Sequence, residues 1–126
     1  MSEGDVWATR LPARLASVAV ARHFADEAGR AMGCNDGTEH VQLLVSELVS
    51  NVVRHAGTPV EVTLYRNDGR LRVEVHDDDP TPPRIAASRP DAFDVGGRGM
   101  FLVDALASAW GIEHQPNGKT IWFEVA

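Results

Sequence analysis

Apolar residues recur along the first half of this chain at helical spacing. Over residues 14–32, and again over 38–55, they return every three or four positions. Both stretches are predicted to be helices, and Thr38 is the expected N-cap of the second. Each helix should bury one apolar stripe, made of Leu15, Val18, Ala21, Ala25, Ala28 and Met32 in the first and Val41, Leu44, Val45, Leu48 and Val52 in the second.

The period changes to two after Pro59. Residues 60–65 and 71–76 alternate between apolar and polar, which predicts two half-buried strands, and Asn67-Asp68-Gly69 between them is a strong hairpin signal. A short strand is expected at 6–8, a helix at 100–109, and a closing hairpin of strands 110–114 and 120–125. The intervening stretch 77–99 is rich in Pro, Asp and Gly, which predicts a long loop.

This order of elements predicts one α+β domain over residues 1–126, a two-layer sandwich with helices on one face of a mostly antiparallel sheet. The parallel strands alternating with helices that dinucleotide-binding folds require do not occur in the pattern. The formal net charge of −6 argues against non-specific nucleic-acid binding. An acidic N-terminus without a long apolar run, together with Cys34 as the one cysteine, favours a cytoplasmic protein that does not enter membranes.

The second predicted helix carries the first candidate chemistry. Glu47 and Asn51 lie four residues apart at the edge of the apolar stripe, His55 continues their row, and Arg54 lies close to it. The carbonyl oxygen of an Asn suits Mg²⁺, and a carboxylate beside that metal could polarise a hydroxyl or a water. The alternative is a helix whose polar edge is simply solvated.

The strand that ends at Asp77 carries the second candidate for chemistry. Strict alternation places Asp77 on the core side, where a buried carboxylate needs a donor, and the exocyclic amine of adenine is one candidate. Alternatively, Asp77 begins a turn and caps backbone amides.

The cluster Gly96-Gly97-Arg98-Gly99-Met100 before a helix could expose backbone N–H groups to phosphates, or be a plain loop. Gly118-Lys119-Thr120 reads more simply as a turn followed by a strand.

Taken in this order, the motifs resemble the GHKL (Bergerat-fold) ATPase superfamily over nearly the whole chain, and within it the small anti-sigma factor serine/threonine kinase-like proteins of actinobacterial type. The resemblance implies Glu47 as general base, Asn51 as the Mg²⁺ ligand, Asp77 as the adenine-reading aspartate and Thr120 near adenine. It implies a lid over about residues 79–98. The ATP-contacting set that it implies is Asn51, Arg54, His55, Asp77, Asp79, Gly97, Arg98, Gly99, Met100 and Thr120.

The resemblance also implies a function. It is that of an ATP- and Mg²⁺-dependent protein serine kinase that phosphorylates an anti-anti-sigma factor of the STAS type and sequesters a sigma factor. The alternative is a non-catalytic, ATP-sensing or nucleotide-independent partner-binding module of the same fold. Homodimerisation through the first strand, near residues 6–12, is compatible with both. Two departures bear on the choice: Asp79 and Thr81 stand where the first glycine box has glycines, and Asp94 and Val95 stand where related kinases can carry a basic residue.

Overall fold

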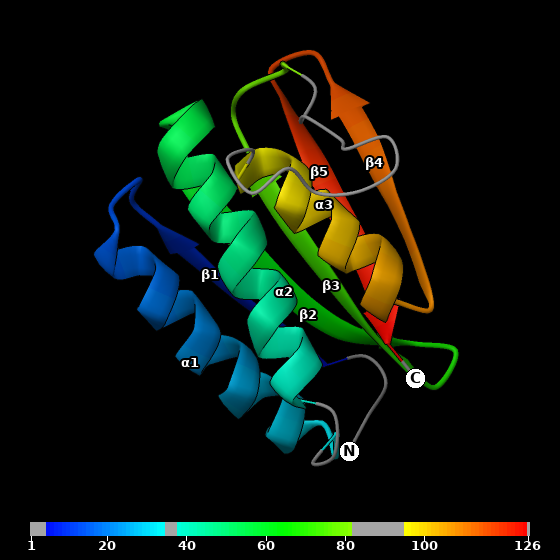
Figure 1. Ribbon diagram of the computed structural model, residues 1–126. Coiled ribbons are helices and arrows are strands. Elements are labelled where there is room, and N and C mark those ends of the chain that lie inside the picture. The colour runs from blue at the N-terminus through cyan, green and yellow to red at the C-terminus, as the bar shows by residue number, and fades with distance from the viewer. Residues whose placement is uncertain (1–4, 35–37, 82–94, 126) are drawn as a thin grey trace.

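The computed structural model describes residues 5–34, 38–81 and 95–125, with the backbone alone over 95–99. Within this part of the chain, five strands form one sheet and the helices cover one of its faces (Figure 1). This is the predicted α+β two-layer sandwich. In chain order the elements are β1 (Val6–Leu11), α1 (Ala16–Ala31), α2 (Thr38–Asn51), η1 (Val52–Ala56), β2 (Val60–Asn67), β3 (Arg70–Asp77), α3 (Val95–Leu106), β4 (Ala109–Gln115) and β5 (Gly118–Val125).

The sheet has the strand order β1-β2-β3-β5-β4, and each neighbouring pair is antiparallel. The predicted hairpin joins β2 to β3 through Asp68 and Gly69, whose φ angles of 54° and 78° are those of a two-residue turn with both central residues left-handed. β1 is longer than the predicted 6–8, because all six of its residues pair with β2. The spacing of apolar residues in the sequence does not reveal such pairing between strands.

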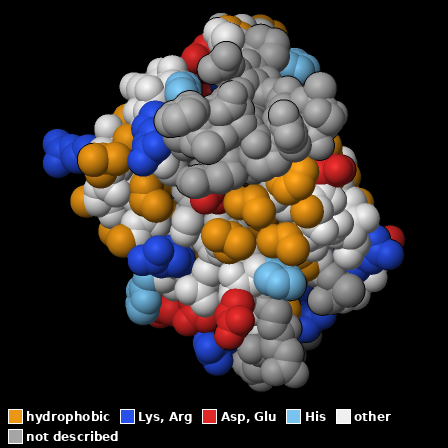
Figure 2. All heavy atoms as spheres, in the orientation of Figure 1, with side chains coloured by type: hydrophobic (Ala, Val, Ile, Leu, Met, Phe, Trp, Pro, Cys, Tyr) orange, Lys and Arg blue, Asp and Glu red, His pale blue; other side chains and the backbone are white. Residues whose placement is uncertain are grey.

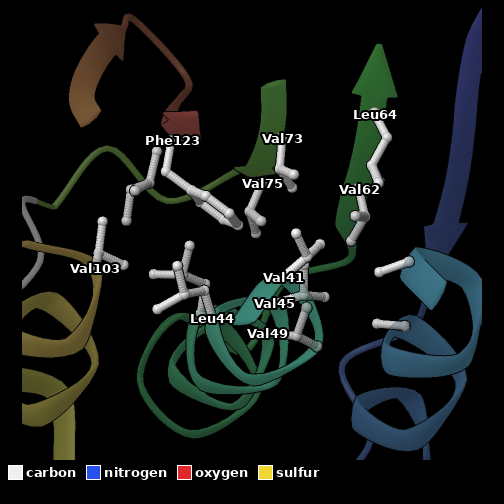
Figure 3. Close-up of a cluster of buried hydrophobic side chains, with 14 of the residues drawn as sticks. Val41, Leu44, Val45, Val49, Val62, Leu64, Val73, Val75, Val103 and Phe123 are labelled. Carbon is white, nitrogen blue, oxygen red and sulfur yellow. The ribbon is translucent and has the colours of Figure 1, made fainter. Parts of the chain in front are cut away.

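The core lies between α2 and the sheet. Val41, Leu44, Val45 and Val49 of α2 point toward strand residues such as Phe123 (Figure 3). The predicted stripe of the second helix is confirmed, since all five of its residues are buried. Of the stripe predicted for the first helix, Val18 is only half-buried and Leu15 is 69% exposed, because Leu15 lies at the N-cap, before the first turn of α1. The other four residues of that stripe are buried.

The second helix changes its geometry near its end. The prediction was one helix over 38–55, but α2 ends at Asn51 and a π-helical turn, η1, follows over Val52–Ala56. Gly57, with φ of 67°, closes it by donating its N–H to the Val52 carbonyl at 2.8 Å. Arg54 and His55 lie on this turn and are exposed. Such turns are rare and are frequently found at functional sites.

The third helix begins earlier than predicted. It spans Val95–Leu106 in place of 100–109, and Ala109 already belongs to β4. Glycine disfavours a helix interior by about 1 kcal/mol relative to alanine. Burial of Met100 and Val103 in the core offsets that cost. The glycine cluster therefore lies in the first turn of α3, and so does the end of the predicted lid; residues 82–94 of that lid lie outside the described residues.

The helix face of the molecule exposes some hydrophobic side chains, among them Leu15 and Val20. Figure 2 shows hydrophobic side chains gathered over the lower middle of this face, where α2 and α3 lie. Leu43 on α2 and Phe101 on α3 are exposed to 40% and 38%. No helix in the described ranges is both long and apolar enough to cross a membrane.

The opposite face of the sheet carries a network of charged side chains. Arg72 donates to Glu74 at 2.9 Å, lies 4.0 Å over the Trp122 ring and contacts Glu124 at 3.4 Å. The Tyr65 hydroxyl donates to Glu74 at 2.7 Å. Burial, followed by this hydrogen bond to Glu74, raises the pKa of Tyr65 above its ordinary value. The folded state therefore holds the phenolic proton more tightly than the unfolded state.

Tyr65 is the one tyrosine of the chain, so its ionisation can be followed alone. We expect absorbance at 295 nm to titrate with a pKa above about 10, and stability to fall as pH rises through that raised pKa. Glu74→Gln should return the pKa toward its ordinary value, whereas Glu39→Gln on α2 should leave it unchanged. Equal midpoints in wild type and Glu74→Gln would contradict this assignment.

Candidate functional site

Asn51 is held at the boundary between core and surface. It is half-buried at the last residue of α2, whose apolar side is fixed by the buried Leu48 and Val49. Its Oδ1 is buried and meets no hydrogen-bond donor in the described part of the chain. A buried acceptor left unpaired costs about 1–3 kcal/mol, so the position points to a ligand that supplies the missing interaction. A hard amide oxygen of this kind fits Mg²⁺.

The other polar residues of this segment divide into two groups. Glu47 lies one turn before Asn51 and is also half-buried, so α2 presents both at the predicted margin of its apolar stripe. Arg54 and His55 are exposed on the π-helical turn. Of the predicted row, Glu47 and Asn51 are therefore half-buried, whereas His55 is exposed.

Asp77 is the most deeply buried carboxylate of the described chain. It ends β3 on the side of the sheet that faces the helices, with 2% of its surface exposed. Its Oδ1 accepts hydrogen bonds from Lys119 Nζ at 3.1 Å and from the backbone N–H of Asp79 at 2.8 Å. Both interpretations of the sequence are therefore correct in part: Asp77 lies on the core side, and it also caps a turn.

Lys119 supplies the donor that the buried carboxylate needs. It is the register partner of Asp77 across β3 and β5, it is 6% exposed, and its Nζ also donates to the Asp79 carbonyl oxygen at 2.9 Å. Interpretation of the sequence overlooked it. Two signals could have found it: Lys119 has the same strand parity as the buried Ile121 and Phe123, and it is the only lysine in the chain.

Thr120 lies on the other face of the sheet. Its Oγ1 is 2.9 Å from His76 Nδ1, and Gln115 Nε2 approaches the same oxygen at 3.4 Å. Thr120 therefore does not share the face of the sheet that carries Asp77, because neighbouring strand residues face opposite sides. Its place near adenine stays a prediction. The residue beside Asp77 is Lys119.

The chain after Asp77 is held by successive side chain-to-backbone bonds. Asp79 Oδ1 accepts the N–H of Thr81 at 2.9 Å. The backbone N–H and the side chain of Thr81, together with the positive charge of Lys119, lower the pKa of Asp79. From the other side, Gly118 packs so closely that a Cβ there would lie 2.3 Å from the Asp77 carbonyl oxygen. Asp79 is therefore an ionised residue of this turn.

The glycine cluster is described only in part. Gly97, Arg98 and Gly99 belong to the first turn of α3, and their side-chain surroundings lie outside the described structure. Met100 is 1% exposed and belongs to the core. Met100 therefore anchors the first turn of α3 to the core.

The buried pair of Asp77 and Lys119 should be strongly coupled. Lys119→Met leaves the Asp77 carboxylate without its counterion, and we expect a loss of about 3–5 kcal/mol in unfolding free energy. The double variant Asp77→Asn/Lys119→Met should recover a substantial part of that loss. Urea denaturation of the wild type, both single variants and the double variant gives the coupling free energy. Additive single-variant losses would show that the two charges do not interact.

The sequence and the fold were compared with those of known proteins. The family model described as a histidine kinase-like ATPase domain matches residues 11–125. The uncharacterized protein SCO4941 of Streptomyces coelicolor is 34% identical over 85 residues, which cover 65% of this chain and 81% of that relative. A crystal structure of the RsbU and RsbW domains of Rv1364c from Mycobacterium tuberculosis shares the fold, with a TM-score of 0.70 and 20% identity over 96% of this chain. This chain spans 32% of that longer one. On the match over residues 11–125, the chain belongs to the family of histidine kinase-like ATPase domains.

Proposed function

We propose that this chain binds ATP together with Mg²⁺ between α2 and the end of β3. The observation that carries the proposal is the buried, unpartnered Oδ1 of Asn51, in a chain that belongs to an ATPase-domain family. Asn51 would hold the metal, which neutralises phosphate charge when bound. The described residues contain no cluster of three or more His, Cys, Asp or Glu that could hold a metal alone. Mg²⁺ commonly takes few protein ligands and completes its shell with phosphates and water.

The remaining residues have distinct proposed roles. Asp77 accepts a hydrogen bond from the exocyclic amine of adenine, for which its position on the helix side of β3 is suitable. The first turn of α3, with Gly97, Arg98 and Gly99, lies near the phosphates, where backbone N–H groups at a helix N-terminus favour anions. Glu47, one helical turn from Asn51, accepts the proton of an attacking hydroxyl.

The proposed reaction is phosphoryl transfer to a serine of a partner protein. A STAS-type anti-anti-sigma factor is the proposed phosphoacceptor, and a sigma factor is the proposed sequestered partner. The match in fold to a chain that contains an RsbW domain supports this choice. Homodimerisation through β1 is part of the same proposal, since β1 is an edge strand and Val6 is 61% exposed.

One observation favours a second function, that of a partner-binding module without phosphoryl transfer. Asp79 stands in place of a glycine of the first glycine box, and its lowered pKa keeps it ionised where phosphates would approach. Like charges repel, so this carboxylate opposes tight nucleotide binding. A protein that captures its partner equally well with and without ATP would fit this second function.

Removal of the proposed metal ligand tests the nucleotide site. In Asn51→Ala we expect ATP affinity to become independent of Mg²⁺, whereas wild type should bind at least about tenfold more tightly with Mg²⁺. Calorimetric titrations with and without the metal measure both. Gln115→Ala is the matched control, because Gln115 also has a buried, unpartnered oxygen but belongs to β4. Loss of the Mg²⁺ effect in the control alone would refute the assignment, and so would wild type that binds no ATP.

Replacement of the proposed base tests the chemistry. We expect Glu47→Gln to retain ATP affinity within about twofold and to lose phosphoryl transfer by about 10²–10⁴-fold. Transfer of labelled phosphate from ATP to the STAS-type proteins of the source genome is the measurement. Glu39→Gln, which removes an exposed carboxylate near the start of α2, serves as a control for changed charge on the helix. Undiminished transfer by Glu47→Gln would exclude the role, and capture without transfer by wild type would support the binding module.

A further inference from the structure

The only lysine of the chain is buried beside the proposed base-reading carboxylate. The sequence has 12 Lys and Arg residues; Lys119 is the one lysine, and the other eleven are arginines. The side chain of Lys119 is 8% exposed and that of Asp77 is 2% exposed. This is therefore a desolvated ion pair at the end of two strands.

A desolvated pair of this kind is a poor device for stability. Moving each ion out of water costs several kcal/mol in effective terms, and apolar residues of similar size often stabilise a core as well or better. The structure offers a polar reason for its presence instead. Both of the described hydrogen bonds that Asp77 accepts go to Oδ1. Lys119 Nζ has three N–H groups, and two of them meet described acceptors, Asp77 Oδ1 and the Asp79 carbonyl oxygen.

We propose that Lys119 reads the base of the nucleotide together with Asp77. An acceptor and a donor stand side by side here, on register partners of neighbouring strands. The edge of adenine offers the complementary pair, a donor at the N6 amine and an acceptor at N1. Asp77 accepts from N6, and Lys119 donates its third N–H to N1. This inference rests on the proposed ATP site and adds a specificity-determining residue to it.

The order of the two contacts disfavours guanine. In the placement that reads adenine, Asp77 faces position 6 of the ring and Lys119 faces position 1. Guanine carries an acceptor, O6, at position 6 and a donor, N1–H, at position 1. In that placement the carboxylate would meet an oxygen and the ammonium would meet an N–H, and guanine would have to shift in the site to exchange the two contacts.

The test compares nucleotides that differ at single ring positions. 1-deaza-ATP lacks the N1 acceptor, whereas 7-deaza-ATP keeps the whole edge and serves as the matched control. Wild type should bind 1-deaza-ATP at least about tenfold more weakly than ATP, as expected for a lost bond to a charged donor, and 7-deaza-ATP about as well as ATP. In Lys119→Met the ratio of ATP to 1-deaza-ATP affinities should fall to near one, and Lys119→Arg should keep part of it.

A second measurement needs no variant. With ¹⁵N-lysine labelling the protein carries one side-chain ammonium group, so its NMR signal is assigned by composition. Adenosine, which has no phosphates, should shift that signal at saturation, and 1-deaza-adenosine should shift it less. An unchanged signal with adenosine bound would overturn the proposal.

The outcomes separate this inference from the proposed function. Equal affinities of wild type for ATP and 1-deaza-ATP would refute the role of Lys119 and leave the ATP site standing. Tighter binding of GTP than of ATP would refute it as well. Wild type that binds none of these nucleotides would overturn both the site and the inference.

Discussion

The pairing of β3 with β5 at the centre of the sheet determines most of what surrounds it. Both strands direct alternate residues into the helix layer, so Val73 and Val75 meet the residues that α2 presents, and Phe123 of β5 completes the same core. The last pair of this ladder on the same face is Asp77 with Lys119. A shift of one residue would bring Thr120 to Asp77 and send Phe123 to the opposite face. The same hydrophobic packing that stabilises the core therefore also fixes which polar residues meet at its end.

α2 joins this core to the site through residues at the margin of its apolar stripe. The buried Leu48 and Val49 fix the rotation of the helix, and that rotation leaves Glu47 and Asn51 half-buried. A residue in such a position can keep an oxygen away from water without being part of the core. The π-helical turn that follows Asn51 ends the α-helical row at that residue. The half-burial of Asn51 therefore follows from how α2 packs against the core.

Sequence periodicity was sufficient for the layers and for many of the buried positions, because alternation and helical spacing record which face is buried. It predicted the stripe of α2, the Asp68-Gly69 turn and the burial of Asp77. It could not predict the π-helical turn, since nothing in Val52–Ala56 departs from a helical pattern. It also placed the start of α3 too late, because glycine propensity is local whereas the burial of Met100 and Val103 is tertiary. Thr120 was placed near adenine from its motif, whereas strand parity puts Lys119 on the face of the sheet that carries Asp77.

The position of the ion pair explains how a buried charge and a binding function can coexist. Asp77 and Lys119 end their strands beyond the apolar ladder, and both bond to the turn at Asp79 in addition to each other. Each ion therefore keeps a partner within the protein when it also meets a ligand. A ligand that offers a donor to the carboxylate and an acceptor to the ammonium adds bonds without separating the charges. The cost of desolvating the two charges then belongs to folding and not to binding, so the proposed recognition of a base would begin from an ordered, water-poor arrangement.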